Sequence, residues 1–182
     1  MRELDETAAA FDRAMRSASL GYALVGGLAV TAWGKPRAPA SIEALLALGP
    51  SSVARLVLEL QAEGFSIAEG ELVEALWEEG HVTASDDRGS FQVDLKIARS
   101  FDEREQVAGA VEVPLAGTHL RVARPEDTLA HKLANGEPED VEDATSILAR
   151  QGKRLDEERL DALARRLGVV DELARLRSQV DG

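Results

Sequence analysis

The part of the sequence that organises the rest is Tyr22–Leu48, YALVGGLAVTAWGKPRAPASIEALLAL. A short apolar run ends in the glycine pair Gly26-Gly27, and a second apolar run follows without a polar break. This order predicts a buried strand, a tight turn and a buried helix. Because glycine has no Cβ, the turn lets an anion such as a triphosphate approach the free N–H groups that begin the helix. A tight turn without a ligand is the simpler alternative, and Gly-Gly alone favours it.

Two standard phosphate-binding loops are excluded. Six residues separate Gly27 from Gly34-Lys35, instead of the four of a P-loop, and Pro36 stands where Ser or Thr would hold the metal. The pattern Gly-x-Gly-x-x-Gly is also absent. A phosphate site in this chain therefore has to be of another kind.

The end of the stretch, Ser41–Leu48, fits a strand or a helix on its pattern alone. Its short apolar run lies between Pro39 and Gly49-Pro50, which favours a strand, whereas its alanines and leucines weaken that prediction. On a strand, Ser41 and Glu43 would point to the same face. The position of this short segment decides whether its polar residues share a site.

Nucleotidyl transfer commonly uses divalent ions that clamp the attacking and leaving oxygens, and Mg²⁺ prefers oxygen ligands. The candidates for such ligands are Glu43 and Asp94, the latter inside the apolar strand pattern FQVDLKI, residues 91–97. Asp94 taken alone is more simply a polar residue on a half-exposed strand. Glu43 and Asp94 can form a metal site only if the fold places their carboxylates close together.

The remaining pattern predicts a mixed α/β half, residues 1–123, followed by a helical half, residues 124–182. The helix that starts near residue 51 is expected to be capped by Ser51-Ser52. The other predicted elements are helices at 4–17, 51–63, 70–79, 128–134, 140–150, 156–167 and 170–179, and hairpins that pair 81–85 with 91–97 and 111–115 with 119–122.

The order of these parts, over about Tyr22–Leu148, resembles the minimal nucleotidyltransferase superfamily. The resemblance is greatest to the branch that includes the abortive-infection nucleotidyltransferase toxins. That pattern has Gly-Gly, then Gly-x-x-Arg-x-Thr-x-Asp-x-Asp, a strand Asp, an acidic helix start, a helix lysine and a closing Asp-x-x-Asp. The resemblance implies an α/β nucleotidyltransferase-like domain with a C-terminal helical lobe, an NTP as ligand or substrate, and Mg²⁺ as cofactor.

The resemblance assigns roles to residues of this sequence. Gly26 and Gly27 match the glycine pair, and Asp94 matches the strand acid. By the same likeness, Arg37, Ser41 and Lys132 would contact the nucleotide, Lys132 near the triphosphate. The remaining matches are Gly34 in the basic turn, Glu126-Asp127 at the helix start, and Asp140 and Asp143 as the closing acids.

The sequence departs from the pattern at the metal site itself. Ser41 stands where the first Asp is expected, Glu43 where the second is expected, and Pro39 replaces the threonine. A serine hydroxyl is neutral, so the clamp loses one negative charge, and removing a group that stabilises the transition state typically costs several kcal/mol. We therefore expect ordinary nucleotidyl transfer to be impaired, whereas weak or one-metal chemistry survives as an alternative.

Composition narrows the classes of protein that fit. The 182 residues include no cysteine, which excludes disulfides and thiolate chemistry, and the formal net charge of −12 disfavours a broad nucleic-acid surface. No apolar run reaches the roughly 18 residues that span a membrane. We expect a cytoplasmic location.

Three functions fit these observations. The first is a nucleotidyltransferase-fold protein with impaired catalysis that binds a nucleotide or a protein partner in a regulatory role. The second is an active variant that moves NMP from NTP to an RNA, protein or small-molecule acceptor with Glu43 and Asp94. The third is an antitoxin-like interaction protein whose pocket is vestigial.

Overall fold

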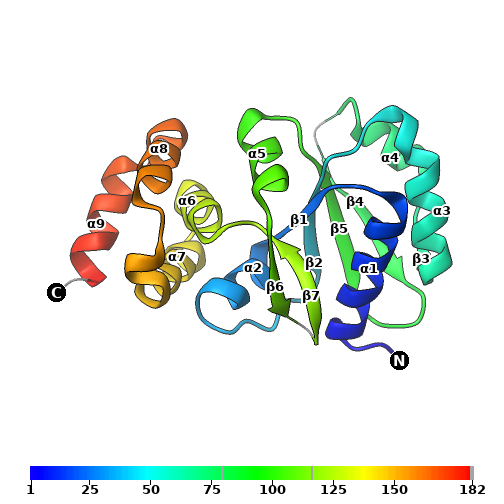
Figure 1. Ribbon diagram of the computed structural model, residues 1–182, viewed down its shortest axis with the longest axis horizontal. Helices are drawn as coiled ribbons and strands as arrows, with labels where there is room; N and C mark the ends of the chain where they lie inside the picture. Colours follow the sequence, from blue (N-terminus) through cyan, green and yellow to red (C-terminus); the bar gives the residue numbers. More distant parts are fainter. Residues whose placement is uncertain (79, 116, 181–182) are drawn as a thin grey trace.

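The computed structural model describes residues 1–78, 80–115 and 117–180. The centre of the molecule is a mixed seven-stranded sheet with the order β3-β4-β5-β2-β1-β7-β6. The chain runs along the long axis of the molecule, with the two termini towards opposite ends (Figure 1). The strands are β1 Tyr22–Val25, β2 Ile42–Leu46, β3 Phe65–Ser66, β4 Val82–Asp86, β5 Gln92–Ile97, β6 Val111–Leu115 and β7 Thr118–Val122.

The register of the three central strands places one polar row across the sheet. β2 runs parallel to β5 with Glu43 opposite Asp94, and antiparallel to β1 with Glu43 opposite Val25. On the far side of β5, Thr83 of β4 lies opposite Asp94. Paired residues project from the same face of a sheet, so Val25, Glu43, Asp94 and Thr83 share one face.

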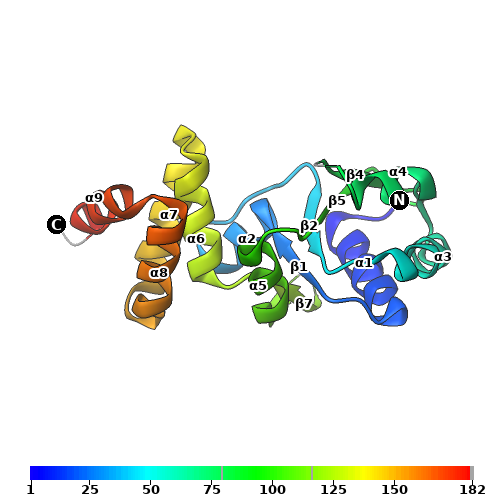
Figure 2. The ribbon, with the colours of Figure 1, turned by 90° about the horizontal axis from the view of Figure 1, so that it is seen from above.

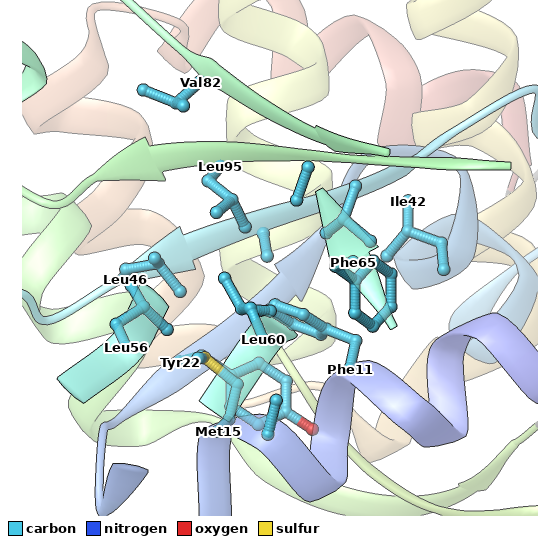
Figure 3. Packing of buried hydrophobic residues seen from close by; sticks show 14 of the residues in the cluster. Phe11, Met15, Tyr22, Ile42, Leu46, Leu56, Leu60, Phe65, Val82 and Leu95 are labelled. Carbon is cyan, nitrogen blue, oxygen red and sulfur yellow. The ribbon is translucent and has the colours of Figure 1, made fainter. Parts of the chain in front are cut away.

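The opposite face of the sheet carries the main hydrophobic core. The helices α1 (Leu4–Ala18) and α3 (Val53–Glu63) cover this face, and Phe11 meets Tyr22 edge-on with ring centroids 5.3 Å apart. The alternation of apolar residues in the strands drives this packing, because every second side chain reaches the same layer. Figure 3 shows side chains that α1, α3 and the strands contribute: Phe11, Met15, Leu56, Leu60, Tyr22, Leu46 and Leu95.

The face with the polar row is only partly covered. Helix α5 (Phe101–Gly109) packs there through Val107, which joins a small cluster with Ala23, Leu45 and Ala123. A capping box between Ser100 and Glu103 fixes the start of this helix. The rest of the face stays open towards the C-terminal helices.

Those helices are α6 Pro125–Asn135, α7 Pro138–Gln151, α8 Glu157–Leu167 and α9 Val170–Val180. They form a second hydrophobic cluster that also takes in Val30 of α2 (Gly26–Trp33). Figure 2 shows the four helices together at one end of the molecule, with α2 between them and the sheet. The indole N–H of Trp33 donates to the carbonyl of Ala123 (2.7 Å), which ties α2 to the end of β7.

The prediction of a mixed α/β sheet followed by C-terminal helices is confirmed, and within Ser41–Leu48 the residues Ile42–Leu46 form a strand. The division into domains 1–123 and 124–182 stays a prediction. Two details were wrong: the side chain of Ser52 makes no capping hydrogen bond, and helix α4 (Glu69–Ala75) ends earlier than predicted. The predicted end of that helix, Glu79, lies outside the described residues.

Helix α5 and the two-residue strand β3 had no counterpart in the prediction. Helix α5 buries only Gln106 and Val107, so its apolar residues show no helical spacing. Its one sequence signal is the Ser-x-x-Glu capping box that precedes it. No helix within the described residues is long and apolar enough to cross a membrane.

Candidate functional site

The site is built around two carboxylates on neighbouring strands. Glu43 on β2 and Asp94 on β5 lie directly opposite each other in a parallel register and project from the open face of the sheet. Asp94 is half-buried and accepts a hydrogen bond from Thr83 Oγ1 at 2.9 Å, whereas Glu43 is exposed. Thr83 therefore orients Asp94, and two negative groups stand side by side where a cation would relieve their repulsion.

The glycine turn lies against one of these carboxylates. Gly26 has φ +58°, and a Cβ built on it would overlap Oε1 of Glu43. A Cβ on Gly27 would stand 2.9 Å from the Cβ of Pro39. Both positions thus need glycine for close backbone packing within the protein, and the Glu43 carboxylate rests over the turn that begins α2.

A cavity of about 230 Å³ opens between the sheet and the helices α5 and α6, and we call it the Gly26 cavity. The sheet side contributes Val25, Gly26, Glu43, Leu45 and Lys96. The helix side contributes Glu103, Gln106, Thr128, His131, Lys132 and Asn135. The cavity therefore runs from the glycine turn to a corner made of neutral polar side chains.

A second cavity, of about 340 Å³, adjoins the first, and we call it the Asp94 cavity. It shares Val25, Glu43, Leu45 and Lys96 with the Gly26 cavity and adds His81 and Asp94. Glu43 and Lys96 stand where the two meet. A ligand that spanned both cavities would pass over the carboxylate pair.

Lys96 pairs with a carboxylate from α5. Its Nζ lies 2.6 Å from Glu103 Oε1. Burial raises the pKa of Glu103, but hydrogen bonds from Lys96 and from the backbone amides of Ser100 and Arg99 outweigh it and bring the pKa to about 2. Glu103 is therefore ionised near neutral pH and holds Lys96 at the edge of the cleft.

The basic turn and the closing acids meet in one ion cluster, made of Arg37, Lys132, Asp140 and Asp143. Arg37 donates to Asp143 through Nε (2.9 Å) and Nη2 (2.8 Å), and Lys132 Nζ lies 3.3 Å from Asp143 and pairs with Asp140. Burial raises the pKa of Asp143, but the hydrogen bonds from Arg37 and Lys132 outweigh it and keep the pKa below its ordinary value. The cluster joins the loop after α2 to α6 and α7.

The residues predicted to contact a nucleotide do not all lie at the same cavity. Lys132 lines the Gly26 cavity, whereas Arg37 does not appear among the described residues that line either cavity and faces Asp143 and Glu139 instead. Ser41 is half-buried, lies one residue before β2 and is not among those lining residues either. The roles of Arg37, Ser41 and Lys132 towards a nucleotide stay predictions.

The acidic helix start has structural partners. Asp127 is fully buried and pairs with Arg159 of α8 at 2.8 Å, and Glu126 accepts the backbone N–H of Asp156 at 2.8 Å. Burial raises the pKa of Asp127, and the nearby charge of Arg159 opposes that rise. Both acids therefore hold α6 against the start of α8.

The donor set limits the metal chemistry. In the described residues no group of three or more His, Asp or Glu side chains is arranged to hold a metal ion. Glu43 and Asp94 offer two carboxylates, which fits one Mg²⁺ that takes its other ligands from water and substrate phosphates. The set does not fit a pair of ions clamped by three carboxylates.

The structure brings in residues that carried no role in the sequence prediction. Lys96 could have been found, because it lies two positions after Asp94 and so shares its strand face. Gln106 and His131 could not, because they come from two helices whose contact depends on the fold. Both line the Gly26 cavity, as do the neutral polar residues Thr128 and Asn135.

A mixed seven-stranded sheet followed by C-terminal helices is the arrangement of the nucleotidyltransferase fold. The sequence matches no family model, and no curated protein is found as a relative. Solved structures do match. The chain has the nucleotidyltransferase fold, and at these low identities the likeness extends to the fold alone.

Two of the matching structures are of ANT(2'')-Ia. Its crystal structure in complex with adenylyl-2''-tobramycin matches with a TM-score of 0.57 and 18% identity, over 89% of this chain and 97% of that one. The solution structure, described as an antibiotic-resistance factor with substrate-regulated conformation dynamics, matches with a TM-score of 0.59 and 17% identity, over 96% and 99%.

A third match is the crystal structure of an antigenic nucleotidyltransferase-like protein from Paracoccidioides brasiliensis. The TM-score is 0.59 and the identity 16%, over 96% of this chain and 91% of that one. The likeness therefore covers sheet and C-terminal helices together.

Proposed function

We propose that this protein binds a nucleoside triphosphate in the cleft between the sheet and α6, and that it serves as a binding or regulatory module with impaired nucleotidyl transfer. Glu43 and Asp94 would hold a single Mg²⁺, and Lys132 would face the phosphates. The observation that carries the proposal is the in-register pair Glu43 and Asp94 beside the Gly26 cavity. The nucleotidyltransferase fold supports the choice of ligand.

Impaired transfer follows from the charge at the site. Mg²⁺, when bound, would neutralise phosphate charge and orient the nucleotide. The chain offers it the carboxylates of Glu43 and Asp94. Two positions before Glu43, the chain has the neutral Ser41. Arg37 is engaged by Asp143, so a cation predicted for the nucleotide is paired within the protein. Binding needs fewer aligned charges than transfer does.

Calorimetry and a pyrophosphate assay test the proposal together. We expect ATP to bind with Mg²⁺ present, without release of pyrophosphate, and we expect Asp94→Asn to weaken binding. Asp171→Asn on the exposed part of α9 is the matched control and should change nothing. Absence of ATP binding at millimolar concentration would refute a nucleotide-binding function.

A second candidate is an active variant that transfers NMP from NTP to an acceptor. It is favoured by the same carboxylate pair, since Asp94 is oriented by Thr83 and open to the Asp94 cavity, where an acceptor hydroxyl could approach. Asp94 would then take the proton of that hydroxyl as a general base. Pyrophosphate release that Asp94→Asn abolishes and Asp171→Asn leaves intact would establish this candidate in place of the first.

A further inference from the structure

The neutral corner of the Gly26 cavity is formed by one buried amide and one imidazole. Gln106 of α5 is only 4% exposed, and its Nε2 lies 2.6 Å from Nε2 of His131 on α6. Both residues line the cavity. The charged residues Glu43, Lys96, Glu103 and Lys132 and the neutral Thr128 and Asn135 also line this cavity. Gln106 and His131 are the neutral lining residues that hydrogen-bond to each other across the two helices.

Each member of the pair has a polar atom left for a ligand. Among the described residues, Oε1 of Gln106 and Nδ1 of His131 have no hydrogen-bond partner in the protein. Neither is a fully buried atom without a partner; in the part of the chain that the structure describes, Nε of Arg159 is the one side-chain atom of that kind. Both side chains line the Gly26 cavity, so a ligand in it can approach them. An acceptor or donor that has no protein partner and is not fully buried can form a hydrogen bond with such a ligand.

The pair can present its free atoms in two ways. With the Gln106 amide N–H donating to His131 Nε2, the neutral imidazole carries its proton on Nδ1, so the pair offers a donor at Nδ1 and an acceptor at Oε1. If the amide turns over, Oε1 accepts from Nε2–H, and the pair offers an acceptor at Nδ1 and a donor at the amide nitrogen. Turning one amide thus reverses the order of donor and acceptor.

The walls of this corner suit a flat ring. Val25 and Leu45 project from the sheet into the same cavity, and Leu45 is 5% exposed, so little of it meets water. A planar heteroaromatic ring can lie on such aliphatic side chains while its edge meets the amide and the imidazole. An acceptor hydroxyl or a phosphate would gain nothing from the apolar walls.

We infer that Gln106 and His131 hold the edge of a nucleobase through a reversible donor–acceptor pair, and that this pair accepts purine and pyrimidine bases without strong preference. The inference rests on the proposed nucleotide binding and adds the part of the cavity that takes the base. Adenine carries a donor at its 6-position and guanine an acceptor, so the two bases require opposite settings of the pair.

Affinity measurements test the assignment. Calorimetry should give affinities for ATP, GTP, CTP and UTP that agree within about tenfold, since the pair adapts to each edge. Gln106→Met and His131→Phe should each weaken all four by about tenfold and leave inorganic tripolyphosphate binding unchanged. Gln179→Met on α9 and His119→Phe on β7, both exposed positions, are the matched controls. Equal losses for tripolyphosphate would overturn the assignment.

A measurement on the unmodified protein keeps the test independent of folding. With ¹⁵N-labelled histidine, NMR reports which nitrogen of His131 carries the proton. ATP and GTP should stabilise opposite neutral tautomers. One tautomer with both nucleotides, or no change on binding, would contradict the reversible pair.

Free adenosine separates this inference from the proposed function. If adenosine perturbs His131 and the triphosphate adds no affinity, the base site stands and nucleotide binding through phosphates fails. If ATP binds and neither variant nor tautomer responds, the base site is wrong and the proposed function survives. If neither adenosine nor ATP binds, both fail.

Discussion

Arg37 and Asp143 lie 106 residues apart in the sequence and form a two-point ion pair, with Nε to Oδ1 at 2.9 Å and Nη2 to Oδ2 at 2.8 Å. The Asp143 side chain is 1% exposed, and that of Arg37 is 23% exposed. A planar guanidinium fits a carboxylate in this way, which makes the contact directional as well as attractive. The pair fixes the loop between α2 and β2 on the C-terminal helices.

Asp143→Asn should destabilise the protein by about 3 kcal/mol, because it removes the buried charge that Arg37 and Lys132 share and leaves them only the more exposed Glu139 and Asp140 as partners. Chemical denaturation would measure the loss as a change in the free energy of unfolding. Asp171→Asn serves as the control, since Asp171 is exposed on α9. A loss below about 1 kcal/mol would place the pair among weak surface ion pairs.

The same residue predicts how stability depends on pH. The pKa of Asp143 is lowered from 3.8, so the folded state binds fewer protons than the unfolded state near and below that pH. Its contribution is therefore complete above the ordinary value and is lost as pH falls through the lowered pKa. The difference in unfolding free energy between the wild type and Asp143→Asn should be constant above about pH 5 and shrink below about pH 4. A difference that grew on acidification would contradict the ion pair.

Gly26→Ala should cost about 2 kcal/mol of stability, because the residue has a positive φ and the new Cβ would meet the Glu43 carboxylate. The double variant Gly26→Ala, Glu43→Ala should lose less than the sum of the single changes, since the clash disappears and only the backbone strain remains. A thermodynamic cycle from chemical denaturation measures this coupling. Strict additivity would mean that Glu43 does not rest on the turn in solution.

Introducing two aspartates at the proposed metal site should strengthen metal-dependent binding. We expect Ser41→Asp with Glu43→Asp to tighten Mg²⁺-dependent ATP binding by about tenfold, because the pair becomes a three-carboxylate site with Asp94. Calorimetry with and without Mg²⁺ reports the change. Ser51→Asp with Glu69→Asp, at two exposed positions, is the matched control. If the metal dependence stays the same, Ser41 does not stand at the metal site.

Binding of the nucleobase should weaken at acidic pH. Burial lowers the pKa of His131 below 6.5, although the charges of Asp127, Asp102 and Glu103 oppose this and that of Lys96 assists it. The imidazole is neutral at pH 7. When it is protonated below its lowered pKa, both ring nitrogens are donors, and the ring can no longer exchange donor and acceptor roles with the Gln106 amide. GTP and ATP affinities should fall as pH drops through that pKa, whereas His131→Phe should lose this response. If His131→Phe lost nucleotide affinity at acidic pH in the same way as the wild type, the titrating group would not be His131.

Much of the fold could be predicted because local pattern and packing agree. The run Tyr22–Val25, the glycine pair and the alternation around Asp94 each predict one conformation, and the sheet adopts all of them. Helix α5 could not be predicted, because its packing depends on Val107 meeting a sheet face that exists only after folding. Its sequence has too few apolar residues at helical spacing to predict it alone.

The sequence by itself determined that strands, helices and the two carboxylates exist, because alternation and glycine placement act over a few residues. Only the tertiary structure decided which of them meet. The parallel register of β2 and β5 set Glu43 beside Asp94, and the packing of α6 and α7 turned Arg37 towards Asp143. Contacts such as Gln106 with His131 arise between helices separated in the chain, and no local pattern specifies them.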